Sequence, residues 1–207
     1  MSEHHLFYIH GFNSSPQSAK AQVLASFLQE QSHHLKQPIH YHVPALPYDP
    51  QRAMALLDEA VNECLTGPQA GTVGLVGSSL GGFFGTWITE KYDVPMALIN
   101  PAVRPHILLE DYLGENENVH TGEKYVFTEA HIHQFKALDI DPLTKIERYY
   151  LLTQTGDETL DYRQGVEKYQ GCKQDIREGG NHGFDDFVHV LPDIMRFLDL
   201  WLEVPID

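Results

Sequence analysis

The segment Gly77-x-Ser79-x-Gly81 holds the residues whose types and spacing most directly suggest chemistry. It follows an apolar run at 72–76 that is typical of a buried strand, and a helix-spaced set of aromatic residues comes after it. A serine on a sharp strand-to-helix turn exposes its hydroxyl above the sheet, and the flanking glycines let the neighbouring strand and helix approach. The spacing therefore predicts that Ser79 is a nucleophile for acyl transfer and that Ser78 points elsewhere.

Two other interpretations of this segment are weaker. A phosphate-binding loop would need a Gly-Lys-Ser/Thr or a GxGxxG pattern, and the segment has neither. A chance Gly/Ser-rich loop stays open, because the short pattern recurs in unrelated sequences.

A serine hydroxyl needs a base, and the base needs a carboxylate that orients it. Asp157 directly follows the apolar run 149–152, where the acid is expected in proteins with such an elbow. Glu158 and Asp161 are the alternatives, although Asp161 has the place of a helix N-cap. The other common acid position, after the fourth predicted strand, holds Asn100, which favours Asp157.

The candidate base is one of 13 histidines. Only His182 and His189 lie near the chain end after both Ser79 and Asp157, which is the order that the elbow requires. His182 sits in a Gly-rich loop able to return an imidazole to the elbow, whereas His189 falls in a helical pattern. We therefore expect His182 to be the base.

An oxyanion hole needs backbone N–H groups directed at the developing negative charge. The residue after the nucleophile, Leu80, is one expected donor, and the loop after the first strand supplies the other. That loop reads His10-Gly11-Phe12, and Phe12 is the candidate. His10 is expected to shape the loop rather than act as a base, because it precedes Ser79 in the chain.

The elements that must position these residues alternate along the chain. Strands are expected at 6–9, 39–43, 72–76, 95–99, 149–152 and 173–177, with helices at 15–28, 50–65, 83–88, 162–169 and 191–202. Such alternation predicts a compact α/β fold with a mostly parallel sheet of about six strands and helices on both faces. The long segment 102–139 is expected to be a small helical cap inserted into a single domain spanning 1–207.

The composition limits the classes of binding partner and the cellular location that we expect. The chain has 14 Lys and Arg against 29 Asp and Glu, a formal charge of −15, which disfavours nucleic acid and anionic membranes. The acidic residue Glu3 and the short apolar run 6–9 argue against a signal peptide. Cys64 and Cys172 form no CxxC motif and favour a reducing compartment, so we expect a cytoplasmic protein. Oligomeric state is left open.

Two further features have ordinary explanations beside the functional ones. His40 and His42 would share a face of a strand and could chelate a metal, but no Cys or carboxylate lies at ligand spacing, so we expect no metal site. Arg104 is a candidate substrate-binding residue at the cap entrance, with a structural ion pair as the commoner alternative.

Taken together, the stretches YIHGFNSSPQSAKA, LVGSSLGGFFGTW, ALINPAVRP, TGDETLDYR and EGGNHGF make the sequence resemble the small bacterial YqiA-type esterases of the α/β-hydrolase superfamily. The resemblance spans nearly the whole chain and implies a reduced α/β-hydrolase fold, carboxylic ester hydrolysis and no cofactor. It places the triad on Ser79, Asp157 and His182. Asn181 departs from the acidic residue expected before the histidine.

The expected function is hydrolysis of small-molecule carboxylic esters, or thioesters, through an acyl-enzyme. An acyltransferase using the same triad is the alternative within enzymes. A non-catalytic binding protein on the same fold is the alternative outside them, since fold does not ensure function. A metal-dependent hydrolase is a weaker third.

Overall fold

The computed structural model describes residues 3–202, so the first two and last five residues of the predicted 1–207 domain lie outside the described part. The elements in chain order are β1 (Glu3–Ile9), α1 (Ala19–Glu30), η1 (Ser32–His34), β2 (Ile39–His42), α2 (Pro50–Thr66), β3 (Gly71–Ser78), α3 (Leu80–Tyr92), β4 (Met96–Ile99), α4 (Pro105–Leu108), η2 (Glu110–Tyr112), β5 (Gly114–Glu117), β6 (Lys124–Phe127), α5 (Glu129–Leu138), η3 (Ile146–Arg148), β7 (Tyr149–Gln154), α6 (Tyr162–Lys168), β8 (Lys173–Arg177) and α7 (Phe187–Phe197).

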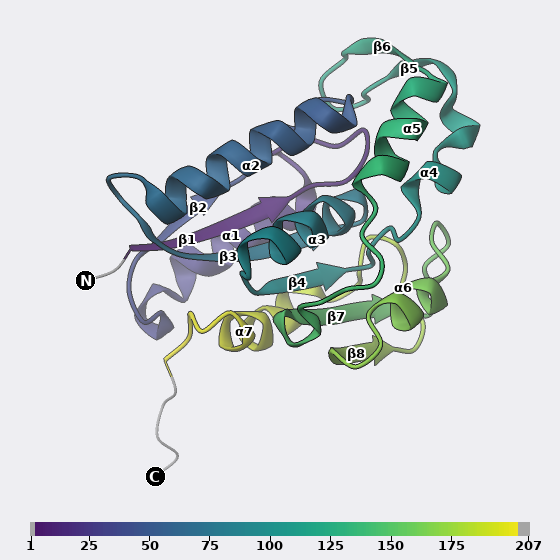
Figure 1. Cartoon of the computed structure of the whole chain (residues 1–207). Helices are drawn as coiled ribbons and strands as arrows, with labels where there is room; N and C mark the ends of the chain where they lie inside the picture. Colours follow the sequence, from purple (N-terminus) through teal and green to yellow (C-terminus); the bar gives the residue numbers. More distant parts are fainter. Residues whose placement is uncertain (1–2, 203–207) are drawn as a thin grey trace.

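Within the described residues, a six-stranded sheet in the order β2-β1-β3-β4-β7-β8 crosses the molecule (Figure 1). All of its neighbouring strands are parallel. The register places Ile9 beside Gly77 and Ser78 beside Ile99, so the ends of β1, β3 and β4 meet at one edge. In such a sheet the loops that follow the strands gather at this edge, where ligands usually bind.

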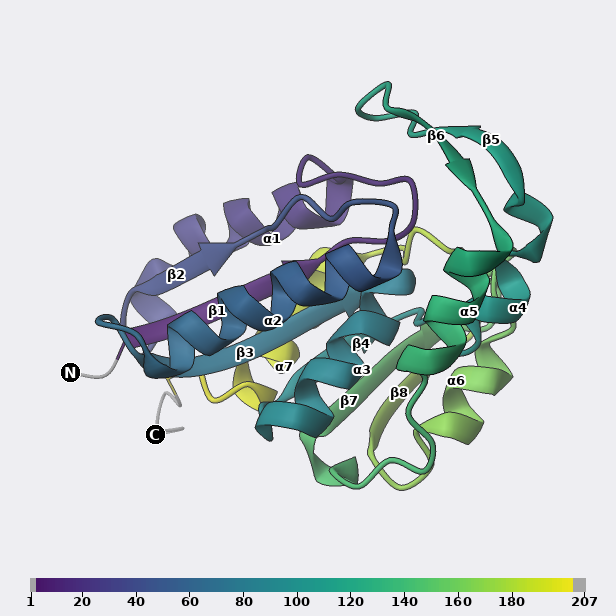
Figure 2. The ribbon, with the colours of Figure 1, turned by 45° about the horizontal axis from the view of Figure 1, so that its top comes forward.

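Helices cover both faces of the sheet. Figure 2 shows α2 and α3 in front of it and α1 and α7 behind. The apolar side chains form one buried cluster on each face, the first shared with α2 and α3 and the second with α1 and α7. The central strands are buried on both faces, which explains their nearly continuous apolar sequences. This arrangement confirms the predicted α/β class with a parallel sheet and helices on both faces.

The sequence predicted a helical insertion, whereas the inserted segment after β4 contains strands as well as helices. Besides α4 and α5 it contains an antiparallel hairpin of β5 and β6, which projects beyond the sheet (Figure 2). Along β6 the side chains alternate between exposed and buried, with Tyr125 and Phe127 inward. This period of two, together with the left-handed turn at Gly122, is what specifies the hairpin. Phe135 of α5 packs on Phe83, which joins the insertion to the main core.

Two helix boundaries differ from those predicted. The first helix starts at Ala19 rather than near Pro16, because the Ser15 hydroxyl accepts from the Gln17 N–H and forms a separate turn. The last helix, α7, spans Phe187–Phe197, whereas the sequence predicted 191–202. It ends before Asp199, a residue with φ of 60°. A positive φ in a non-glycine residue terminates a right-handed helix.

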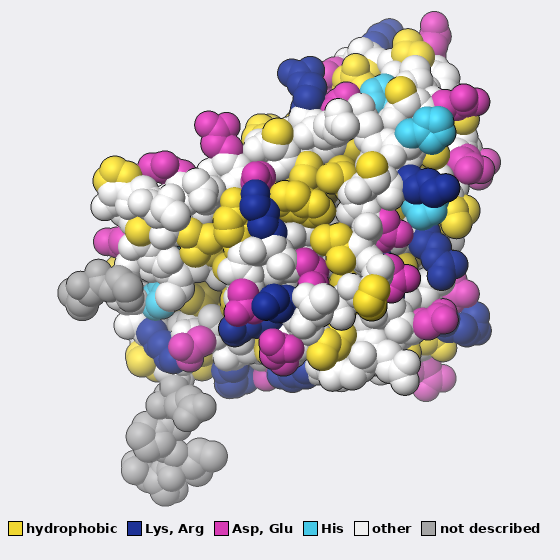
Figure 3. All heavy atoms as spheres, viewed as in Figure 1, with side chains coloured by type: hydrophobic (Ala, Val, Ile, Leu, Met, Phe, Trp, Pro, Cys, Tyr) yellow, Lys and Arg dark blue, Asp and Glu magenta, His cyan; other side chains and the backbone are white. Residues whose placement is uncertain are grey.

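The surface over α2 and α3 carries acidic and basic side chains interspersed with apolar ones (Figure 3). Several of the basic residues are paired, for example Lys91 with Asp58 and Arg148 with Asp93. The excess of acidic residues is therefore not gathered into one charged area on this face. None of the helices between residues 3 and 202 is long and apolar enough to cross a bilayer.

Glu90 of α3 fixes the loop that leads into β7. Its carboxylate accepts from the Thr144 N–H and hydroxyl at 2.9 and 2.6 Å, from the Lys145 N–H at 3.2 Å and from the Tyr149 hydroxyl at 2.8 Å. Partial burial opposes ionisation, but these donors, Thr144 foremost, outweigh it and lower the pKa of Glu90. Glu90→Ala is expected to reduce the free energy of unfolding by about 1–3 kcal/mol at pH 7, measured by urea denaturation.

The pH dependence follows from the direction of that shift. A carboxyl whose pKa is lowered by folding contributes stability above its unfolded pKa and loses that contribution as pH falls through the folded value. The difference between wild type and Glu90→Ala should therefore shrink in acid. Glu59→Gln, on the exposed face of α2, is the control and should change little. A deficit of constant size down to the acid transition would contradict the account.

Candidate active site

Ser79 lies at the turn between β3 and α3, with φ of 55° and ψ of −122°. A non-glycine residue with these angles is strained, and such strain is concentrated at functional sites. Backbone segments of the same chain approach the turn closely on both sides of Ser79. A Cβ at Gly81 would lie 1.9 Å from the Ile9 carbonyl oxygen, and one at Gly77 would lie 2.6 Å from the Gly81 carbonyl oxygen. Glycine is therefore required at both positions.

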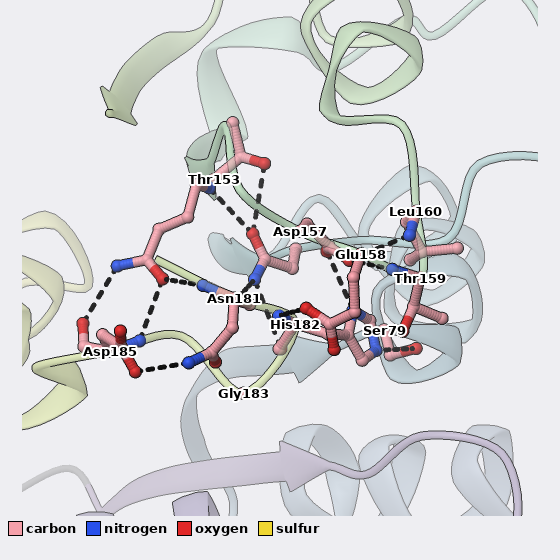
Figure 4. Close-up of polar contacts among 12 residues, drawn as sticks. Ser79, Thr153, Asp157, Glu158, Thr159, Leu160, Asn181, His182, Gly183 and Asp185 are labelled. Carbon is pink, nitrogen blue, oxygen red and sulfur yellow. Dashed lines mark hydrogen bonds and ion pairs between the residues drawn. The ribbon is translucent and has the colours of Figure 1, made fainter. Parts of the chain in front are cut away.

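His182 connects Ser79 with Asp157 (Figure 4). The His182 Nδ1 is 2.8 Å from Asp157 Oδ2, and its Nε2 is 3.1 Å from the Ser79 Oγ. An ionised carboxylate only accepts, so the proton belongs on Nδ1 and leaves Nε2 to accept from the serine hydroxyl. The three residues predicted from the sequence are thus brought together in hydrogen-bonding order.

Asp157 is held as an anion. Its side chain is 1 % exposed, and Oδ1 accepts from the Thr159 and Leu160 N–H groups at 2.9 and 2.8 Å. Burial alone would raise the pKa of Asp157, but the hydrogen bonds from His182, Leu160 and Thr159 outweigh it and lower the pKa. A buried anion at this distance favours the imidazolium that forms when His182 takes a proton.

A pocket of about 600 Å³ opens beside Ser79 and His182. Its walls are mainly apolar and come from the loop after β1, the start of α3, the α4–η2 segment and the loop after β7. The lining residues are Phe12, Ser79, Leu80, Ala102, Pro105, Ile107, Leu108, Leu109, Asp111, Tyr112, Thr159, Leu160 and His182. A volume of this size suits a small organic molecule.

The family to which the chain belongs is identified by a match to a family model. The model of a family described as "Uncharacterised protein family (UPF0227)" matches residues 5–199. The chain belongs to the UPF0227 family. This membership, together with the α/β-hydrolase structures that resemble it, confirms the resemblance to YqiA-type esterases that the sequence indicated.

Solved structures similar to this UPF0227 chain have the α/β-hydrolase fold. Est1E from Butyrivibrio proteoclasticus with ferulic acid bound has a TM-score of 0.72 at 12% identity, covering 96% of this chain and 88% of Est1E. The α/β-hydrolase domain-containing protein 10 from mouse has a TM-score of 0.68 at 15% identity, with 94% and 88% covered. The lidless serine hydrolase XC6422 from Xanthomonas campestris has 0.63 at 11%, with 99% and 86% covered.

The alternative triad residues of the UPF0227 chain have other contacts. Ser78 is buried in β3. The Glu158 carboxylate accepts from the His182 backbone N–H at 3.0 Å, so it contacts the histidine loop but not the imidazole. Asp161 accepts from the Arg163 N–H as the N-cap of α6. His189 lies on α7 with an exposed side chain.

The two expected oxyanion donors lie on either side of Ser79. Leu80 is the first residue of α3, where a backbone N–H has no partner within the helix. The backbone before Phe12 passes beside the serine, since a Cβ at Gly11 would lie 3.2 Å from the Ser79 Cβ. Leu80 and Phe12 also line the pocket. His10 is buried, and its Nε2 accepts from the Leu46 N–H, so it packs within the loop as expected.

Arg104 is exposed at the N-terminus of α4 and does not line the pocket. Neither does its side chain make an ion pair within residues 3–202. The charged residue that does line the pocket wall is Asp111. The structure therefore brings an acidic group, and not the predicted cation, to this part of the site.

Sequence reasoning missed the residues that hold the His182 loop. The buried Gln154 accepts through Oε1 from the Asn181 and Asp185 N–H groups at 3.1 and 2.9 Å, and it donates to the Asp185 carbonyl. Asn100 donates to the carbonyls of Asn181 and His182 at 3.0 and 3.3 Å. A polar residue ending an otherwise apolar strand was the available signal for Gln154. Asn181 itself donates to Asp185.

Proposed function

We propose that this chain is a serine hydrolase that cleaves carboxylic esters through an acyl-enzyme. The observation that carries the proposal is the continuous pair of hydrogen bonds from Ser79 through His182 to the buried, ionised Asp157. A serine hydroxyl with an oriented imidazole at 3.1 Å is the arrangement that activates a weak nucleophile.

The reaction has two halves. The Ser79 Oγ attacks the acyl carbon while His182 Nε2 takes the hydroxyl proton, and Asp157 stabilises the imidazolium. His182 then protonates the leaving alcohol as the bond to it breaks. In the second half, His182 takes a proton from water, the resulting hydroxide equivalent attacks the acyl-serine, and Ser79 recovers its proton as the acid leaves.

The backbone N–H groups of Leu80 and Phe12 are proposed to hold the oxyanion. Their residues flank Ser79 and line the same pocket, and the strained turn at Ser79 fixes the nucleophile relative to both. Donors of this kind typically contribute about 3 kcal/mol each to transition-state stabilisation.

The pocket suggests which esters bind. Apolar side chains from Ile107, Leu108, Leu109 and Leu160 line it, and Asp111 is its acidic member. No Lys or Arg is among the described lining residues. We therefore propose esters with an uncharged, apolar or aromatic acyl group, and expect an acyl group that ends in a carboxylate to be excluded. The structurally similar Est1E has been solved with ferulic acid bound, which is consistent with a protein of this fold accepting an aromatic acid.

The proposal is tested with a panel of p-nitrophenyl esters and the full chain. We expect kcat/KM for p-nitrophenyl butyrate to exceed that for the hemisuccinate by about 10-fold or more, since burial of an unpaired carboxylate is costly. Asp111→Asn should narrow the gap, because it removes the repelling charge. Turnover of neither ester, or equal turnover of both, would contradict the activity or the substrate class respectively.

Hydrolysis is separated from acyl transfer by product analysis with added alcohols or amines, where we expect the free acid. EDTA is expected to leave the rate unchanged, as the proposed steps use side chains, backbone N–H groups and water. Cytoplasmic location stays a prediction from the sequence; Cys64 and Cys172 are both free thiols.

A further inference from the structure

Three metal-ligating side chains from separate elements meet on the α2 side of the sheet. They are His5 of β1, His42 of β2 and Cys64 of α2, and one ligand atom from each lies within 4.8 Å of the others. The His5 Nδ1 is 3.0 Å from the His42 Nε2, and the Cys64 Sγ is 3.9 Å from the same nitrogen. None of the three takes part in the proposed reaction.

The strand register explains why the histidines face each other. β1 and β2 are parallel, with His5 beside His40 and Phe7 beside His42. Because alternate residues of a strand share a face, all four rings lie on the same side of the sheet, under α2. The Phe7 ring stacks on His42 with centroids 4.5 Å apart, which restricts the orientation of the imidazole.

The tautomer of His5 is fixed by a second contact. Its Nε2 lies 2.9 Å from the carbonyl oxygen of Gln69, which can only accept. The proton therefore belongs on Nε2, and the Nδ1 lone pair points at His42. Histidines that bind metals commonly donate their other ring N–H to a backbone carbonyl in this way.

The protonation states of His42 and Cys64 determine how these side chains could bind a metal ion. Burial, with the adjacent His5 and His40, lowers the pKa of His42 and keeps this ring neutral, which is the ligand form. Burial and the nearby Glu63 raise the pKa of the Cys64 thiol. A thiol of this kind becomes a thiolate when a metal ion replaces its proton.

We infer that His5, His42 and Cys64 form a binding site for Zn²⁺. Two imidazole nitrogens and one thiolate are ligands that Zn²⁺ prefers, and solvent can complete the tetrahedral set because His42 and Cys64 are only half-buried. In a tetrahedral zinc site the nitrogens lie about 3.3 Å apart and a nitrogen and a sulfur about 3.6 Å apart. The observed separations of 3.0 Å between the nitrogens and 3.9 Å between His42 Nε2 and the Cys64 Sγ are each within about 0.3 Å of these values, and all three ligand atoms lie within 4.8 Å of one another.

Zinc binding changes the protonation of two of the three ligands. Cys64 loses one proton to solvent, and His42 moves its ring proton from Nε2 to Nδ1, so one proton is released per zinc ion. The ion would join the edge strand β2 to β1 and α2, which makes its role structural. This inference departs from the expectation of no metal site, because the fold brings in Cys64 and His5 from positions distant from His42 in the sequence.

The test is a zinc titration of the tag-free full chain against a chromophoric chelator, with calorimetry in buffers of different ionisation enthalpy. We expect one ion per chain with Kd of about 1 μM or lower, release of about one proton, and a rise in Tm of about 5–10 °C at zinc 100-fold above Kd. With Co²⁺ as the probe, a thiolate-to-metal charge-transfer band should appear.

Cys64→Ala is expected to weaken binding by at least about 100-fold and to abolish both the proton release and the charge-transfer band. Cys172→Ala is the matched control: its thiol is also free and lies next to β8, at the opposite edge of the sheet. His42→Gln provides a second variant, and Tm in EDTA reports whether each variant folds. Unchanged affinity in Cys64→Ala and His42→Gln, an equal loss in Cys172→Ala, or no binding by wild type would overturn the inference. Esterase activity is not its readout.

Discussion

Ser79→Ala is expected to lower kcat for p-nitrophenyl butyrate by about 10⁴- to 10⁶-fold while the protein stays folded. The variant removes only the hydroxyl that His182 Nε2 contacts at 3.1 Å, and the half-exposed site tolerates the smaller side chain. The residual rate should come from the oxyanion donors and from binding alone. Initial rates under saturating substrate, with Tm recorded for the same preparations, provide the measurement.

Ser78→Ala is the matched control, because Ser78 is the adjacent serine and is buried in β3, whereas the His182 ring makes its hydrogen bonds to Asp157 and Ser79. We expect its kcat to stay close to that of wild type. If Ser79→Ala kept most of the activity, or if Ser78→Ala lost as much, the nucleophile assignment would be wrong.

Asp157→Asn is expected to reduce kcat by about 10⁴-fold with little change in KM. The asparagine oxygen can still accept from the Thr159 and Leu160 N–H groups, but its amide would donate to the imidazole. His182 would then carry its proton on Nε2, where it can no longer accept from Ser79. The fold should be preserved because the new side chain has nearly the same shape.

Glu158→Gln tests whether the effect belongs to the carboxylate in contact with the imidazole. Glu158 accepts from the His182 backbone N–H and not from the imidazole, and glutamine can replace it there. We expect a change in kcat of no more than about threefold, since a neutral acceptor keeps most of this hydrogen bond. A larger loss in Glu158→Gln than in Asp157→Asn would reverse the assignment of the acid.

The sheet was predictable because its signals are local. Continuous apolar runs such as 96–99 and 149–152 indicate strands buried on both faces, and Gly or Pro residues end them. The start of α1 was not predictable in the same way, because Ser15 and Ser18 are both good N-caps and only the folded turn at Ser15 selects between them. The hairpin β5–β6 was missed because its strands are short and largely polar.

In the candidate site, too, the features with local sequence signals were predictable and the others were not. Chain order and the elbow pattern predicted Ser79, Asp157 and His182 as a triad, since these follow identifiable strands, and the structure places them within hydrogen-bonding distance of one another. The contacts of Gln154 and Asn100 with the His182 loop depend on three-dimensional proximity of segments far apart in sequence. Arg104 follows β4 as expected. Its position at the exposed start of α4 depends on the path of the inserted segment, which no local sequence pattern specifies.

The most direct test of the central claim is covalent labelling of the full chain by a fluorophosphonate, followed by intact-mass and peptide mass spectrometry. An activated serine attacks the phosphorus atom and displaces fluoride, whereas an ordinary serine does not react. We predict one adduct per chain, on Ser79, absent in Ser79→Ala and strongly slowed in Asp157→Asn. Failure of the folded wild-type protein to label, or labelling that persists in Ser79→Ala, would contradict the account.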